Sequence, residues 1–389
     1  MTVVLNAWVM IREQNAEVSR PSGLIEADTF HLGSYGYSPE MQTPDMIRAV
    51  IENDLREVNA LPGVIAAAQM NTIPLSGSNW GTGVTTMHDP DNEYSMGVSY
   101  YLGDENTLTA LGVELIAGED FTAEDVVWQE PFGNTWPPVV IVTKALGARL
   151  FRDVEPEDLL GRTFKVSGDN VVTIKGVLDT LQSPASGNWN VEMTMVSPQR
   201  RLTSSVRYMV RTEPGERDRM MPIVEELLRT GGEGGESLAR GRLVRNLYSM
   251  EETRRESYNL DIGLNNLLSF VMIVLLLITA LGTLGLASFS VTRRTKQIGI
   301  RRALGASEHD IRRYFLLENL MISGFGVVLG SLMTVGFNVW LVDLMNFPKI
   351  DWWGIPLGIV CLLLLGQVSV WGPANRACQI SPASATRTV

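Results

Sequence analysis

Several residue types that catalytic sites need are scarce in this sequence. Lysine occurs five times, and none of the five follows a glycine: Lys144, Lys165, Lys175, Lys296 and Lys349. The Gly-Lys-Ser/Thr motif, whose lysine reaches the phosphates of a nucleotide, is therefore absent. The three histidines have no spacing suited to a zinc site. We predict a protein that is not an enzyme and that uses no cofactor or metal.

Cysteine is scarcer still. Only Cys361 and Cys378 occur in the 389 residues. No disulfide framework can form in the long segment that precedes them, and cysteine use does not indicate the compartment.

Charge is unevenly distributed along the chain. Residues 1–261 carry 22 Lys and Arg against 38 Asp and Glu, whereas residues 262–389 carry 10 against 5. Such asymmetry indicates two environments, a soluble acidic domain and membrane spans with basic cytoplasmic edges. Because the overall chain is acidic and its basic residues lie at a membrane edge, we predict no binding to nucleic acid.

Long uncharged runs are present in the second part. Ile262–Thr292 contains 31 residues without a charge, and a helix of about 20 apolar residues crosses a bilayer. We predict spans at about 264–290, 319–342 and 352–375. Basic residues follow the first span in the segment 293–313, and the positive-inside rule places this segment and the C-terminus in the cytoplasm. The domain before the first span must then lie outside.

The first eleven residues, Met1–Ile11, are apolar apart from Asn6. Eleven residues are too few to span a bilayer, and neither the charged start nor the cleavage site of a signal peptide is visible. Three interpretations remain, namely the C-terminal half of a first transmembrane helix, an interfacial anchor, or a buried helix end. Since the following domain is expected outside, we favour the first interpretation and treat residues 1–19 as the remnant of a truncated first helix.

The residues between, 20–257, have the pattern of a folded domain. Pro44–Ala60 carries apolar residues at helical spacing, and Arg217–Arg229 is a second amphipathic helix. Short β-branched runs predict strands, and Phe164–Val166 with Val171–Val177 predicts a hairpin.

Strands mixed with a few helices at irregular intervals favour an α+β fold. Two strand–helix–strand units, around 44–70 and 206–244, are compatible with a structural repeat. The predicted fold class is therefore an α+β domain at 20–257, outside the membrane, followed by an α-helical transmembrane bundle at 258–389. The first helix of this bundle would be truncated.

The spans contain one packing pattern and few ionisable residues. Gly326 and Gly330 form G-x-x-x-G, which permits close approach of another helix, although glycine is also common in membrane helices generally. Glu318 and Asp343 lie at the two ends of the second long span. An ion-coupled transporter would keep a carboxylate near mid-membrane, so the sequence argues against that class.

The segment 293–313 reads RRTKQIGIRRALGASEHDIRR. Ser307 and Asp310 have the spacing of a capping box, which predicts that a helix begins there and runs into the next span. An ordinary positive-inside loop would explain the basic residues alone. A short amphipathic element that docks in a partner's groove also explains the interleaved apolar residues and glycines.

Within that segment, Thr295–Ala306 (TKQIGIRRALGA) resembles the signature of the MacB/FtsX family of ABC-transporter permeases. Leu111–Phe121 (LGVELIAGEDF) resembles a recurrent motif of that family's periplasmic domain, and the ending Ile380–Ala383 is similar too. The resemblance implies an α-helical bundle of four-helix permease type, of which the first helix is truncated here, with a large periplasmic α+β domain between the first two helices. It also implies a permease dimer that pairs with two ATPase subunits, either separate or fused.

The resemblance implies a role for the cytoplasmic loop. In the family this loop contacts the ATPase as a coupling helix, and ATP-driven motion there reshapes the periplasmic domains without moving substrate through the membrane core. The residues that match are Lys296, Gln297, Ile298, Gly299, Ile300, Arg301, Arg302, Ala303, Leu304 and Gly305. Gln297 stands where the family often has Glu.

We therefore expect a multi-pass permease subunit of an ABC-type exporter in the bacterial inner membrane. Its expected partners are a separate ABC ATPase subunit, a second identical or related permease, membrane lipid and, in some systems, a periplasmic adaptor. Two alternatives remain open, an FtsX-like signalling scaffold that controls a periplasmic enzyme and a lipoprotein-releasing permease. The sequence does not identify a substrate.

Overall fold

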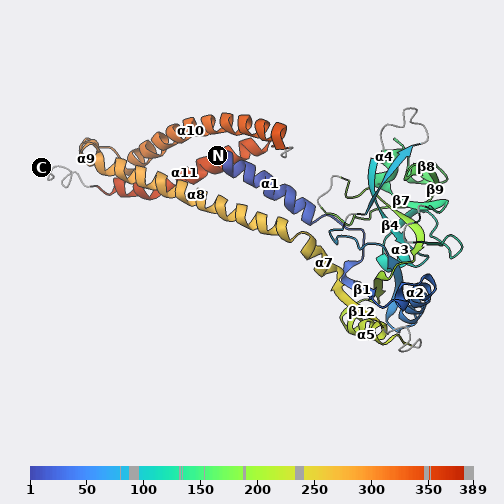
Figure 1. Ribbon diagram of the computed structural model, residues 1–389. Helices are drawn as coiled ribbons and strands as arrows, with labels where there is room; N and C mark the ends of the chain where they lie inside the picture. Colours follow the sequence, from blue (N-terminus) through green and yellow to red (C-terminus); the bar gives the residue numbers. More distant parts are fainter. Residues whose placement is uncertain are drawn as a thin grey trace. The chain divides into compact units, whose positions relative to one another are not determined.

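The computed structural model describes residues 1–78, 80–86, 96–130, 133, 135–152, 154–186, 190–232, 241–345, 350 and 352–380. Of the expected C-terminal similarity at Ile380–Ala383, only Ile380 lies within the described residues. The chain divides into two compact units, which are both drawn in Figure 1. One unit is Pro21–Asn259, and the other combines Met1–Arg20 with Leu260–Val389.

A four-stranded antiparallel sheet forms the first part of the unit Pro21–Asn259. Its order is β12-β1-β11-β2, with bounds β1 Thr29–Gly36, β2 Val64–Met70, β11 Ser205–Thr212 and β12 Arg242–Ser249. Two helices, α2 (Pro44–Asn59) and α5 (Arg217–Thr230), bury their apolar faces against this sheet. The order interlocks β1-α2-β2 with β11-α5-β12, which is the split βαβ arrangement. The expected pair of strand–helix–strand units is confirmed.

A charged pair is buried between α2 and β12. Arg242 Nη1 donates to both carboxylate oxygens of Asp54 at 2.9 Å, and the Tyr208 hydroxyl donates to Asp54 Oδ2 at 2.7 Å. Both charged side chains are 1% exposed. Burial raises the pKa of Asp54, and the charge of Arg242 opposes this rise.

Six further strands, which lie between β2 and β11 in the sequence, pair with one another in a closed ring. Neighbours around the ring are β4–β3, β3–β8, β8–β9, β9–β7, β7–β10 and β10–β4. Their bounds are β3 Gly81–Thr86, β4 Met96–Gly103, β7 Val139–Thr143, β8 Thr163–Val166, β9 Asn170–Leu178 and β10 Thr194–Arg201. The β8–β9 hairpin confirms the predicted one. Because a closed ring has no free edge among its six strands, its ladder hydrogen bonds are satisfied internally.

Short elements complete the ring. β5 (Leu115–Gly118) pairs with β9, and β6 (Val127–Gln129) pairs with β10. The helix α4 (Lys144–Leu150) packs its Leu146 on the valine-rich core of the ring. Within the described residues, single turns of 3-10 helix lie at Glu26–Asp28, Glu40–Gln42 and Pro156–Leu159.

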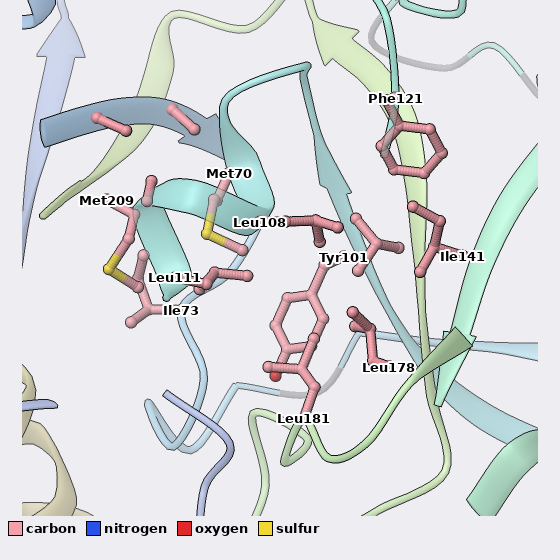
Figure 2. Packing of buried hydrophobic residues seen from close by; sticks show 14 of the residues in the cluster. Met70, Ile73, Tyr101, Leu108, Leu111, Phe121, Ile141, Leu178, Leu181 and Met209 are labelled. Atoms are coloured by element: carbon pink, nitrogen blue, oxygen red, sulfur yellow. The ribbon is translucent and has the colours of Figure 1, made fainter. Parts of the chain in front are cut away.

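The motif at 111–121 lies where the ring meets the four-stranded sheet. The helix α3 (Thr107–Leu111) ends at Gly112, whose φ is +68°, and at Gly118 (φ +83°) an added Cβ would collide with the carbonyl oxygen of Lys175. Figure 2 shows Leu111 and Phe121 in one cluster with residues of both sheets, including Met70, Tyr101, Ile141 and Met209. The motif therefore stabilises this junction, and its glycines are required by the backbone.

The helix α7 (Met250–Ser257) packs on β1. Ser249 and Glu252 form a capping box at its start. Thr253 Oγ1 lies 2.8 Å from His31 Nε2, and burial lowers the pKa of His31 to about 4. This contact therefore holds a neutral imidazole at neutral pH.

The second unit is helical. Its elements are α1 Thr2–Val18, α8 Asn259–Arg293, α9 Thr295–Ala303, α10 Glu308–Met345 and α11 Gly354–Cys378. Three of them, α8, α10 and α11, are long and apolar enough to cross a membrane. They contain the residues predicted as spans at 264–290 and 319–342 and most of those at 352–375, which confirms three long apolar helices in this part of the chain.

Candidate functional site

The candidate coupling segment is the short helix α9, which connects α8 to α10. It ends at Ala303, Leu304 is its C-cap, and Gly305 follows in the left-handed region with φ +97°. Ser307 and Asp310 then cap the start of α10. Ser307 Oγ accepts from Asp310 N at 3.2 Å, and Asp310 Oδ2 accepts from Ser307 N at 3.0 Å. The predicted capping box is confirmed.

One face of α9 is buried against its own chain. Ile298 is only 5% exposed, and Gly299 beside it is buried. Ile298 belongs to a cluster with residues from the end of α8, the start of α10 and the end of α11, namely Val291, Ile311, Phe315, Val370, Ala374, Ala377 and Cys378. These two residues therefore hold α9 in place and do not present a surface to a partner.

Arg302 also faces the protein. Its Nη1 donates to the carbonyl oxygens of Cys378 (2.7 Å) and Ile380 (2.9 Å), at the end of α11. Its Nη2 lies 3.6 Å from Glu308 Oε1. The sequence offers no means of distinguishing this arginine from Arg301.

A second ion pair holds the start of α9. Arg294 Nη1 donates to Glu318 at 2.9 Å and lies 3.0 Å from the Tyr314 hydroxyl, with both partners on α10. Arg301 lies with its guanidinium carbon 4.8 Å from the centre of the Tyr314 ring, a cation–π distance. Tyr314 therefore contacts Arg294, which directly precedes α9, and Arg301, which lies within it.

The opposite face of α9 is exposed. Leu304 is 84% exposed and Ile300 is 50% exposed, although both are aliphatic. The exposed residues among the ten predicted ones are Lys296, Gln297, Ile300, Arg301, Ala303, Leu304 and Gly305. The structure thus divides the predicted set into an outward face, which combines apolar and basic residues, and three inward residues, Ile298, Gly299 and Arg302.

The two glycines predicted to pack helices differ. A Cβ added at Gly330 would lie 3.1 Å from Met1 Cβ, so Gly330 faces α1. At Gly326 an added Cβ would meet nothing within 4 Å in the described chain. A closer helix approach occurs at Gly358 against Leu5, and Gly366 lies against Ser323 at a similar distance to that at Gly330.

Sequence reasoning missed a row of neutral polar contacts between α1 and α10. Asn338 Nδ2 donates to Asn6 Oδ1 at 3.0 Å, and the hydroxyl oxygens of Thr334 and Thr2 lie 3.2 Å apart. Asn6, Thr334 and Asn338 are all buried. Thr2 and Asn6 are four residues apart on α1, and Thr334 and Asn338 are four residues apart on α10. This spacing places the two polar residues of each helix on one face, and it is the sequence signal that would have revealed this row.

No group of three or more His, Cys, Asp or Glu side chains that could hold a metal ion occurs among the described residues. The expectation that the protein uses no cofactor or metal remains a prediction.

Two family descriptions match the chain. Residues 8–222, more than half of the sequence, match the MacB-like periplasmic core domain. Residues 269–382 match the FtsX-like permease C-terminal domain. The second match includes all of α9 and the residues that hold it in place, Arg294, Ile298 and Arg302, together with their partners.

Individual proteins are similar as well. The macrolide export ATP-binding/permease protein MacB of Chromobacterium violaceum is 25% identical over 284 residues, covering 70% of this chain and 41% of the relative. Its counterpart in Wolinella succinogenes is 26% identical over 308 residues, covering 75% and 45%. The periplasmic region of MacB from Actinobacillus actinomycetemcomitans aligns in structure at 12% identity and a TM-score of 0.36, covering 62% of this chain and 98% of that one.

This chain spans less than half the length of these two MacB relatives, whose names include both ATP binding and a permease. The two family descriptions together cover residues from α1 to the end of α11. The chain belongs to the MacB/FtsX family of ABC-transporter permeases.

Proposed function

We propose that this chain is the membrane-spanning permease subunit of an ABC-type exporter and that a separate ATPase subunit binds the outward face of α9. The observation that carries this proposal is the division of α9 into two faces. Exposed Ile300 and Leu304 next to Arg301 form the mixed apolar and basic surface that a helix inserted into a partner's groove requires. If no partner bound this segment, exposure of the apolar Leu304 side chain to water would not stabilise the protein.

The basic cluster also supports an orientation. Arg293, Arg294 and Lys296 follow α8 directly, and basic residues mark the cytoplasmic side of a bacterial inner membrane. On this assignment the C-terminus is cytoplasmic and the domain at 20–257 is periplasmic.

A four-helix arrangement, with residues 1–19 contributing the first helix, is supported by the burial of Asn6. A polar side chain buried at depth needs a partner there, and Asn338 provides it. Residues 258–389 would form the remainder of the permease. We further propose that two such chains, identical or related, form the working unit, with a periplasmic adaptor where the system has one.

The chemistry of the spans favours mechanical coupling over ion coupling. Glu318 of α10 is paired with Arg294, which lies between α8 and α9, and the buried polar side chains between α1 and α10 are neutral. On this proposal, ATP hydrolysis by the partner displaces α9. The displacement moves the long helices that α9 connects, α8 and α10, and their motion reshapes the periplasmic domain.

Copurification of the ATPase with the full chain tests this proposal. Arg301→Glu should reduce the amount of retained ATPase about tenfold, because the proposed contact uses the positive charge of Arg301 and a negative charge there would replace attraction with repulsion. Leu304→Asp should have a similar effect, since its apolar side chain would leave the partner's pocket. Arg313→Glu removes an exposed basic charge of the same loop, outside the matched residues, and should leave retention within about twofold.

Equal retention by wild type and both α9 variants would overturn the proposal. Equal loss in Arg313→Glu would show that only the total charge of the loop matters. An export assay on the same variants separates an exporter from a signalling scaffold, because only an exporter loses transport together with the ATPase.

A further inference from the structure

We propose that Arg302 is a positioning residue that fixes α9 to the C-terminal end of α11, and that this attachment converts partner binding into helix motion. The attachment is independent of any partner, whereas its use in coupling rests on the proposed function. Arg301 and Arg302 would then have separate tasks, although they are adjacent and identical in type.

The chemistry of the α11 end explains why a guanidinium binds there. The last four carbonyl groups of a helix have no partner within the helix, and they form the negative end of its dipole. Arg302 Nη1 donates to the carbonyl oxygens of Cys378 and Ile380 at 2.7 and 2.9 Å. A cation from a different helix therefore caps α11. Hydrogen bonds to a charged donor are among the strongest available to the backbone.

A second contact lies one turn earlier on the same face of α9. Ile298 precedes Arg302 by four residues, so both side chains point to the same side of the helix. Ile298 packs with Ala374, Ala377 and Cys378 of α11. An apolar and a charged contact one turn apart prevent α9 from rotating or sliding on α11 unless both contacts break.

Arg301 is rotated by about 100° around the helix axis, and it lies outside this contact. Its guanidinium lies over the Tyr314 ring, and the residue is exposed. A force applied to the outward face of α9 would thus be received at Arg301, Ile300 and Leu304. It would be passed to α11 through Arg302 and Ile298.

Cys378 provides a direct measurement of this attachment. Its thiol is buried and lies 3.1 Å from the carbonyl oxygen of Glu308, whereas Cys361 is exposed. In full-length Cys361→Ser protein in lipid nanodiscs, Cys378 should react slowly with N-ethylmaleimide. Arg302→Ala should raise this rate about tenfold, because two hydrogen bonds to a charged donor are lost.

Matched variants make the result specific. Arg302→Lys keeps the charge but lacks the second guanidinium nitrogen, which lies 3.6 Å from Glu308 Oε1, so its labelling rate should lie between those of wild type and Arg302→Ala. Arg301→Ala should label within about twofold of wild type. Slow labelling in Arg302→Ala, or equally fast labelling in Arg301→Ala, would overturn the attachment.

The coupling role is tested with the ATPase that copurifies with the full chain. Arg302→Ala should retain this ATPase within about twofold of wild type but lose most of the permease-dependent change in its hydrolysis rate. Arg301→Glu should lose the bound ATPase itself. Unchanged stimulation in Arg302→Ala, or loss of binding as large as in Arg301→Glu, would overturn the positioning role.

If the wild-type chain retains no ATPase, the proposed function fails. Labelling of Cys378 still decides whether Arg302 holds α9 in place.

Discussion

The two units of this protein both bury a polar contact between elements that are distant in sequence, but they use different chemistry. In the domain the contact is the ion pair of Arg242 and Asp54, with each side chain 1% exposed. In the membrane unit it is the neutral amide pair of Asn6 and Asn338. Two ion pairs in the membrane unit, those of Arg294 and Arg302, retain 23–58% exposure of their side chains, and both arginines lie at or next to an end of α9.

The environment in which each unit folds explains this difference. A domain that folds from water can desolvate a carboxylate if a guanidinium and a further donor such as Tyr208 replace the water. A helix in hydrocarbon has no water for an unpaired ion, so charges remain at the edges and neutral amides make the buried contacts. The three predictions below test this comparison, in order of decreasing expected effect.

Removal of one charge from the domain pair should have the largest effect. Arg242→Met leaves the Asp54 carboxylate buried without its partner, which should cost about 3–5 kcal/mol of unfolding free energy at pH 7. Pulse proteolysis of the full chain in detergent measures this loss. Arg229→Met, which breaks an exposed pair with Glu226, is the matched control and should cause no measurable change.

The loss in Arg242→Met should depend on pH. Burial raises the pKa of Asp54 above its unfolded value, so the folded state binds more protons in the window between the two values. Stability in this variant therefore decreases as pH rises from about 4 through the raised folded pKa. If the variant is equally destabilised at pH 5 and pH 8, Asp54 is not the cause.

His31 should have the next largest effect. Its folded pKa of about 4 lies below the unfolded value of 6.5, so the unfolded state binds more protons between these values. The stabilisation by the neutral form is complete above pH 6.5 and decreases as pH falls toward 4. Acidification from pH 7 to 4.5 should cost about 2 kcal/mol. The rate of proteolytic cleavage near α7, followed as a function of pH, measures this loss of stability. In the His31→Gln variant this rate should no longer depend on pH in the range between 4 and 6.5.

The smallest effect is expected within the membrane unit. Asn338→Leu removes the donor to Asn6, and hydrogen bonds between membrane helices contribute about 0.6–2 kcal/mol. Denaturation with sodium dodecyl sulfate measures the loss, and the double variant Asn6→Leu/Asn338→Leu should lose less than the sum of the single variants. A loss as large as that of Arg242→Met would remove the distinction between the two units.

Local patterns in the sequence predicted local structure well. Helical spacing located α2 and α5, and the capping box at Ser307 located the start of α10. Uncharged length located the three long spans. Each of these depends on residues within a few positions of one another, where backbone geometry alone sets the periodicity.

Contacts between distant segments were not predictable in the same way. The closure of the ring depends on β4 pairing with β10, and their paired residues Ser99 and Thr194 are far apart in the chain. The difference between Arg301 and Arg302 depends on which side of α9 meets α11. Neither is encoded by residue type alone, since both require the tertiary arrangement.

The position of the ring in the chain has a topological consequence. β2 ends at Met70 and β11 begins at Ser205, and Met70 pairs with Arg207 on the adjacent antiparallel strand. The 71–204 segment therefore leaves and re-enters the four-stranded sheet at neighbouring strand ends, a separation that a short turn could bridge. Changes of length within this segment therefore need not alter the order of the four strands, provided that the apolar cluster shared by the segment and the sheet is kept.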